Sequence, residues 1–160
     1  MRFLVLLSVL CLLQSLQGPN RQQGMATRGD HVMGFSHEKT SHHFVLYPDG
    51  GLIQVSANQA DDQASIDQVR MHLGHIAKIF AAGNFHAPML IHDTTPPGVA
   101  SMEKLKTEIR YDFSQTDRGA SIRLTTPNPE ALDAIHAFLL FQIIDHQTGD
   151  SPAIQALPKS

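Results

Sequence analysis

The chain contains almost no cysteine. Of its 160 residues one is a cysteine, Cys11, and none is a tryptophan. Because Cys11 lies in an N-terminal segment that we expect to be removed, the mature chain would have no disulfide, no thiol nucleophile and no Cys-ligated metal site. Any bound metal ion would therefore need histidine, methionine, carboxylate or water as its ligands.

Two common catalytic motifs are also missing. No G-x-S-x-G stretch occurs, and Asp49-Gly50-Gly51 reads as a hairpin turn because no helix follows it directly. This excludes the nucleophile elbow of α/β-hydrolases and the usual glycine-rich phosphate loops. The glutamates show no pairing that would indicate two-carboxylate hydrolysis. We therefore do not predict an enzyme.

Basic residues are few. Lysine and arginine number 12 against 15 acidic residues, and the formal net charge is −3 with neutral histidines. Nucleic-acid binding requires concentrated positive charge, so nucleic acid is not expected as a partner. The ten histidines make the charge sensitive to mild acid instead.

The two ends differ in composition from the rest of the chain. Met1-Arg2 and the apolar residues 3–13 resemble a signal peptide, which we place at residues 1–18, and imply a periplasmic or secreted protein. The apolar run is too short for a bilayer span, so no stable span is expected after cleavage. Polar residues 19–41 predict a flexible tether, and residues 151–160 a disordered tail.

Residues 42–150 predict one α+β domain. Residues 42–57 and 109–125 each read as two alternating strands joined by a turn. An amphipathic helix follows each hairpin, the first ending at Gly83 and the second beginning at Asn128-Pro129. The apolar positions of the two helices are Ile66, Val69, Leu73, Ile76 and Phe80, and Leu132, Ile135, Leu139 and Ile143.

This pattern is a duplicated ββα unit, at residues 42–83 and 107–147, with an inserted arm at residues 84–106. We expect a four-stranded antiparallel sheet with two helices packed on one face. Prolines at 88, 96 and 97 predict that residues 84–98 of the arm are non-helical, and that a short helix follows from residue 99. Inserts on a repeated scaffold often carry function.

Histidines supply the leading functional hypothesis, a non-enzymatic site for copper or zinc. His72 and His75 are three residues apart on the first helix, so their rings can converge. A methionine thioether among the ligands would favour Cu(I), and Met33 and Met71 are alternatives to Met89 in this role. Asp61 or Asp93 would orient a ligating imidazole by a hydrogen bond. The alternative is that these histidines are ordinary structural residues. The predicted ligands are His42, His43, His72, His75, His92 and Met89, with His86 a weaker candidate.

Two further histidines are expected to be structural. His136 and His146 fall on the apolar stripe of the last helix, where a buried, hydrogen-bonded imidazole is the usual arrangement. Burial of a neutral imidazole lowers its pKa, so stability should fall in mild acid.

A second functional hypothesis is a small binding module. Here residues 84–98 would present an apolar surface to an organic ligand or a protein partner, and the histidines would serve structure or pH sensing. The apolar residues of this surface would be Phe85, Met89, Leu90 and Ile91.

Four stretches carry a resemblance. MGFSHEKTSHHF, RMHLGHIAKIF, FHAPMLIHDTTPPG and FQIIDHQTGD resemble small secreted bacterial proteins of an uncharacterised family, over residues 33–150. The resemblance implies a stand-alone exported domain. It brings no activity, ligand or site residue with it.

Overall fold

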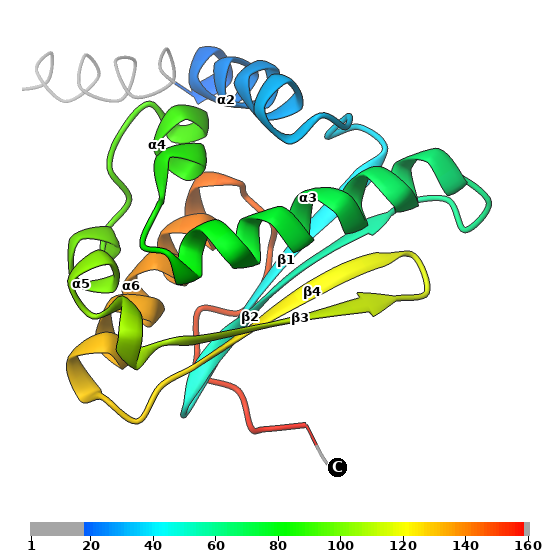
Figure 1. Cartoon of the computed structure of the whole chain (residues 1–160). Coiled ribbons are helices and arrows are strands. Elements are labelled where there is room, and N and C mark those ends of the chain that lie inside the picture. Colours follow the sequence, from blue (N-terminus) through cyan, green and yellow to red (C-terminus); the bar gives the residue numbers. More distant parts are fainter. Residues whose placement is uncertain (1–17, 159–160) are drawn as a thin grey trace, which may run out of the picture.

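A four-stranded antiparallel sheet forms the centre of the protein, in the order β1-β2-β4-β3 (Figure 1). The computed structural model describes residues 18–158, so the predicted signal peptide lies outside the described residues except for its last position. The predicted α+β class and sheet are confirmed. The strands are β1 (Thr40–Tyr47), β2 (Gly50–Ala57), β3 (Arg110–Thr116) and β4 (Gly119–Thr125).

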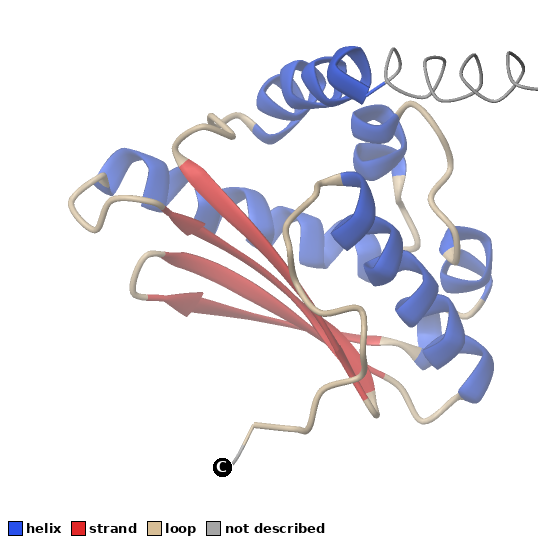
Figure 2. Ribbon diagram, turned by 180° about the vertical axis from the view of Figure 1, so that it is seen from behind, coloured by secondary structure: helices blue, strands red, loops and turns tan. Residues whose placement is uncertain are grey.

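Two long helices cover one face of this sheet. Helix α3 (Gln63–Ala81) lies over β2, β3 and β4, and α6 (Pro129–Asp145) lies over β1 and β2. Figure 2, seen from behind, shows the strands in front of α3 and their other face free of helices. Each helix follows its own hairpin, so the duplicated ββα unit is confirmed.

Local signals in the sequence define the ends of these helices. Asp62 Oδ1 accepts a hydrogen bond from Ser65 N at 3.0 Å, and Asn128 Oδ1 accepts one from Ala131 N at 3.2 Å. These side chains satisfy donors that the first turn of a helix leaves free. Gly83 follows the end of α3 with φ 81°, a conformation that glycine adopts without strain.

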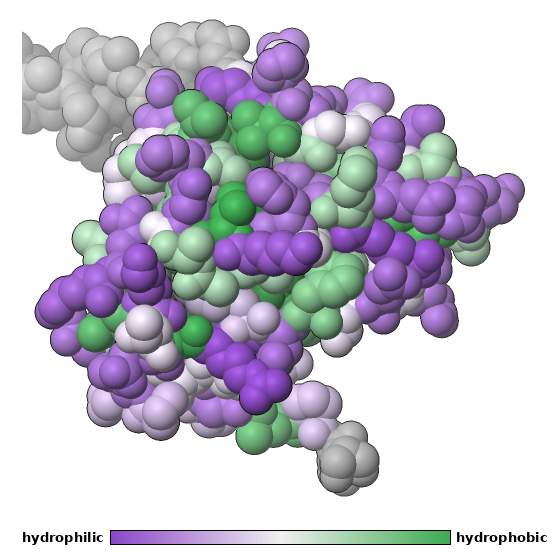
Figure 3. Space-filling view, viewed as in Figure 1, coloured by the Kyte–Doolittle hydropathy of each residue, from purple (hydrophilic) through white to green (hydrophobic). Residues whose placement is uncertain are grey.

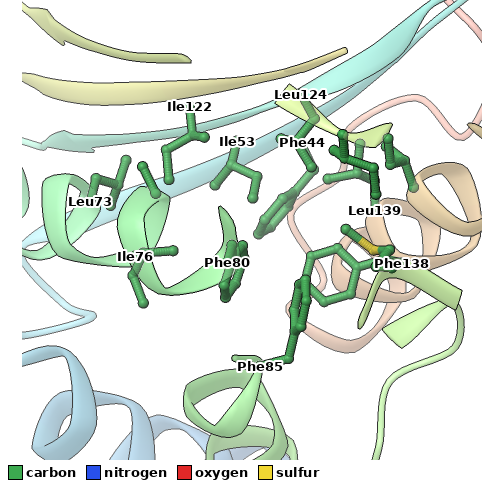
Figure 4. Packing of buried hydrophobic residues seen from close by; sticks show 14 of the residues in the cluster. Phe44, Ile53, Leu73, Ile76, Phe80, Phe85, Ile122, Leu124, Phe138 and Leu139 are labelled. Carbon is green, nitrogen blue, oxygen red and sulfur yellow. The ribbon is translucent and has the colours of Figure 1, made fainter. Parts of the chain in front are cut away.

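The core lies between the sheet and the two helices. Phe44, Ile53 and Ile122 are aligned across β1, β2 and β4, and all three are buried. Figure 4 shows them facing the helices, with the aromatic rings of Phe80, Phe85 and Phe138 packed beyond them. The apolar stripe predicted for α3 is wholly buried, and in the stripe of α6 Leu132 alone is half-buried.

The inserted arm is more helical than its prolines suggest. It forms α4 (His86–His92), α5 (Val99–Lys104) and the 3₁₀ turn η1 (Lys106–Glu108). The prediction that residues 84–98 are non-helical was therefore wrong for α4. Pro88 is the third residue of α4, where the N–H has no acceptor within the helix, so its ring interrupts nothing.

The predicted N-terminal tether is a helix over much of its length. Residues 18–33 form α2 (Gly18–Met33), which packs against α4. Met25 is buried, and Arg28 Nε donates hydrogen bonds to the carbonyls of Leu90 and Ile91 at 3.1 and 3.0 Å. The polar composition misled the prediction because α2 is held largely by polar side chains bound to other helices.

The C-terminal tail is also less free than predicted. Its described residues, 151–158, are mostly exposed, but Gln155 N donates a hydrogen bond to Leu46 O of β1 at 2.8 Å. Figure 2 shows this segment running past the sheet. The prediction of disorder was therefore wrong at Gln155, since an edge strand offers unpaired backbone groups to a neighbouring segment.

The surface is mainly hydrophilic. In the view of Figure 3 apolar residues appear as separate areas between polar ones. Large exposed apolar side chains such as Met71, Leu90 and Ile144 belong to different helices. Among the helices of residues 18–158, none combines the length and the apolar character needed to cross a bilayer.

Gly98 provides a stability test of the contact between α5 and α6. Its φ is 84°, and an added Cβ would lie 2.1 Å from Ala134 O; Gly149, with φ 76°, has no atom within 4 Å of that position. Gly149→Ala should therefore cost only about 1 kcal/mol, the price of a left-handed alanine. Gly98→Ala should cost at least about 2 kcal/mol more, measured by urea unfolding. Equal losses would contradict the close contact.

Candidate functional site

The side chains of β1 alternate between the two faces of the sheet. His42 lies in the same inward row as Phe44 and Leu46, whereas His43 points to the opposite face, as period-two geometry requires. His43 Nδ1 is 2.9 Å from Asp150 Oδ1, and its side chain is 48% exposed. Of this predicted pair, therefore, His42 alone reaches the interior.

The C-terminal end of α6 brings a second imidazole to His42. His146 is the C-cap residue of α6, and its ring lies 5.5 Å from that of His42, with an angle of 9° between the planes. The ring centres of Phe44 and His146 are 5.8 Å apart. The hydrogen bond predicted for the His146 ring is absent within the described residues, and the prediction also missed this neighbour.

A third imidazole, His92 of α4, is held by hydrogen bonds on both sides. Its side chain is 1% exposed, its Nδ1 is hydrogen-bonded to Asp145 Oδ2 at 2.5 Å and its Nε2 lies 2.9 Å from Gln142 Oε1. The ring centre lies 4.9 Å from that of His146. Because both ring nitrogens have hydrogen-bond partners, neither is free to bind a metal ion. His92 is therefore a neighbour of His42 and His146 and is not itself an available ligand.

Asp145 connects His92 to the N-terminal helix. Arg21 Nη2 of α2 donates to Asp145 Oδ1 at 2.9 Å, and Gln22 Nε2 donates to Asp145 O at 2.8 Å. Burial acts to raise the pKa of this carboxyl, but the hydrogen bonds and charges of His92 and Arg21 outweigh it and hold the pKa below its usual value. The carboxylate that contacts His92 is therefore that of Asp145, and neither Asp61 nor Asp93.

Two hollow spaces meet at the His42–His146 pair. An outer groove of about 310 Å³ lies beneath α2, and an inner cavity of about 70 Å³ lies among the sheet, α3, α4 and α6. Met25 lines only the groove, and Phe80 only the cavity. The residues that line both are Met33, His42, Ile91 and His146. We call this set the junction.

The imidazoles at the junction are uncharged at neutral pH. The pKa of His146 is lowered to about 3 by burial and then by His42 and His92, against the opposite effect of Asp145. The pKa of His42 is lowered to about 4 by burial and then by His72, His43 and His37. A neutral imidazole is the form that binds a metal ion.

Ring hydrogen bonds separate the histidines into two groups. Among the described residues, those whose rings are hydrogen-bonded are His37, His43, His92 and His136. The hydrogen bonding predicted for His136 is confirmed, since its Nε2 donates to the carbonyls of Tyr47 and Gly50 at 2.8 and 3.1 Å, although the residue is half-buried. His42, His72 and His146 have no such bond within the described residues, so their ring nitrogens remain available.

His72 and His75, the pair of ligands predicted on α3, border different hollows. His72 lines the inner cavity and meets the ring of Phe35 edge-on at 5.5 Å, and its pKa is lowered to about 4 by burial and then by His75. His75 is exposed and borders a different groove, with Met71 and Phe113. Met89 lines neither the groove nor the cavity at the junction.

The predicted set is therefore only partly assembled. His42, His72 and His92 lie in or beside the inner cavity, whereas His43, His75 and Met89 do not. Within residues 18–158, no three His, Cys, Asp or Glu side chains are arranged to hold a metal ion together. His146 was the main omission, and its proximity to His42 could not be seen from spacing because 104 positions separate them in the sequence.

The apolar surface expected on the arm is largely internal. Phe85 is fully buried, with its ring 4.4 Å from that of Phe80, and Ile91 is 8% exposed. Leu90, by contrast, is 60% exposed. Ile91 lines the junction, but residues 84–98 do not present Phe85 to a partner, so this part of the binding-module hypothesis was wrong.

The lowered histidine pKa values predict acid sensitivity. The unfolded chain binds protons near pH 6.5, above the folded values of His42, His72 and His146, so stability is complete above about pH 6.5 and is lost as the pH falls towards 4. Each group contributes at most about 2 kcal/mol of this loss at pH 5.

His146→Phe should reduce the slope by keeping a ring and removing the titration. Urea unfolding between pH 7 and pH 4, with a chelator present to exclude metal effects, measures the slope. His86→Gln is the control because His86 is exposed. If His146→Phe and the wild type show the same slope, burial of a neutral His146 is not the cause.

Comparisons of the chain with protein-family models, with curated proteins and with solved structures found no match. The likeness to small secreted bacterial proteins was not tested by these comparisons and stays an expectation. A function for the chain must therefore be argued from the junction, that is, from its two imidazoles and from Met33, which lines the same two spaces.

Proposed function

We propose that the protein is a non-enzymatic copper-binding domain, with Cu(I) held at the junction by His42, His146 and Met33. The observation that carries the proposal is that two uncharged imidazoles, with rings 5.5 Å apart, and the side chain of Met33 line both the outer groove and the inner cavity. A thioether and imidazoles form a soft ligand set, which favours Cu(I) over zinc.

The spacing of the two rings supports this ligand set. Metal–nitrogen bonds of about 2 Å bring the centres of two coordinating imidazoles to about 5 Å from each other. The rings of His42 and His146 are 5.5 Å apart. Binding requires the nitrogens to turn toward a common point, and the adjoining hollows leave space for that rotation.

The thioether of Met33 supplies the third ligand of the proposed site. The described residues hold no group of three His, Cys, Asp or Glu side chains in ligand positions, and a site of two histidines and a methionine does not require one. Met33 is half-buried at the end of α2. In the proposed site α2 therefore supplies a ligand and also covers the ion.

Competition against a chromophoric Cu(I) chelator under reducing conditions tests the site. We expect binding tighter than about 10 μM, weakened at least tenfold by His42→Ala or His146→Ala. Met33→Leu should weaken Cu(I) by about tenfold and leave Zn(II) binding unchanged, because zinc does not depend on a thioether.

Matched controls come from exposed residues of α3. His75→Ala and Met71→Leu, both outside the junction, should leave Cu(I) affinity unchanged. Circular dichroism of every variant checks that the fold persists. Binding weaker than about 10 μM, or binding unaffected in the His42→Ala/His146→Ala double variant, would refute the proposal.

We also propose that residues 1–18 export the domain to the periplasm or to the medium. The apolar run after Arg2 supports this, since it has the pattern of a signal peptide. Expression of the whole chain with a C-terminal epitope tag should give a shortened product outside the cytoplasm. A full-length product confined to the cytoplasm would disprove export.

A further inference from the structure

The inner cavity is lined mainly by apolar side chains. Its apolar walls include Phe44, Ile53, Leu73, Ile76, Phe80 and Phe138. At about 70 Å³ it is well below the roughly 300 Å³ of the smallest usual organic-ligand pockets. A water molecule takes about 30 Å³ in the liquid, so the cavity has room for about two or three heavy atoms.

Besides the imidazoles without ring hydrogen bonds, an amide in this cavity wall lacks a partner. Gln142 is 4% exposed and lines the cavity, and its Nε2 makes no hydrogen bond within the described residues. A buried amide N–H left unpaired costs about 1–3 kcal/mol. The position thus combines a small apolar space with one unused hydrogen-bond donor.

His92 explains why the donor end faces this space. Its Nδ1 donates to the carboxylate of Asp145 at 2.5 Å, a short contact typical of charge-assisted bonds. Gln142 turns its carbonyl Oε1 toward His92 Nε2, at 2.9 Å. The amide NH₂ group is then the end that remains free.

We propose that the inner cavity receives a small ligand that coordinates the copper ion and accepts a hydrogen bond from Gln142 Nε2. The inference rests on the proposed Cu(I) site. Two imidazoles and one thioether occupy three positions, and Cu(I) accepts a fourth ligand. The cavity adjoins His42 and His146, so that position is reached from within the protein.

The ligand class follows from size and chemistry. It has two or three heavy atoms, one end able to bind Cu(I) and the other able to accept a hydrogen bond. Carbon monoxide has these properties and serves as the probe, since its stretching frequency reports both the metal and any hydrogen bond to its oxygen. A hydrogen bond to that oxygen increases electron donation from the metal and lowers the frequency.

The experiment is infrared spectroscopy of the Cu(I)-loaded protein under carbon monoxide. We expect a narrow C–O band in the wild type. Gln142→Leu should move the band to higher frequency and weaken carbon monoxide binding about tenfold, with Cu(I) affinity unchanged. Gln68→Leu, on the exposed side of α3, is the matched control and should change neither.

A second variant keeps the test decisive if Gln142→Leu does not fold. Ala87 lines the cavity and is half-buried, so Ala87→Leu should fill the space and abolish the C–O band while copper remains bound. A chain that binds no Cu(I) refutes the copper proposal itself. Copper binding with no C–O band, or with a band unchanged in both variants, refutes this inference alone.

Discussion

The carboxylate of Asp145 is the contact on which the arrangement of the site depends. It accepts hydrogen bonds from Arg21 of α2 and from His92 of α4, and it occupies the last position of α6. Asp145 thereby joins α2, α4 and α6, none of which directly follows another along the chain. His146 is the next residue, so the same contact determines where its ring lies relative to His42.

The contact also has an energetic consequence for the cluster. A buried carboxylate requires partners, and it has them in the guanidinium and the imidazole. His92, held beside His146 by its bond to Asp145, lowers the pKa of His146 further, adding to the effect of burial. The paired histidine thus helps to keep the unpaired one neutral.

The sheet and its two helices could be predicted because their signals are local and repeated. Alternation around Ile53 and Ile122 indicated the strands, and Asp62 and Asn128 marked where helices begin. Both kinds of signal act within a few residues, and the duplication of the ββα unit showed each of them twice.

The other elements depend on contacts that sequence spacing does not reveal. Helix α2 is polar in composition and is held by Arg21 and Arg28 bound to distant helices. Helix α4 tolerates Pro88 only because the proline falls in its first turn. His42 and His43 looked equivalent as neighbours, yet the strand separates them to opposite faces, and a histidine at the end of another helix became the neighbour of His42.

The polar groups at the junction reduce the stability of the folded protein. Uncharged imidazoles without hydrogen bonds, and an amide donor without an acceptor, lower the stability of the unbound protein relative to an apolar core of equal volume. Natural sequences retain such groups chiefly where a ligand compensates for them. A ligand that binds only the folded state restores the lost stability in proportion to the logarithm of its concentration over its dissociation constant. In this chain His42, His146 and the Gln142 amide adjoin the groove beneath α2 or the inner cavity, whereas the other buried polar atoms without a partner in the described residues, Tyr111 Oη and Thr116 Oγ1, line neither. A ligand at the junction would therefore compensate only the first group.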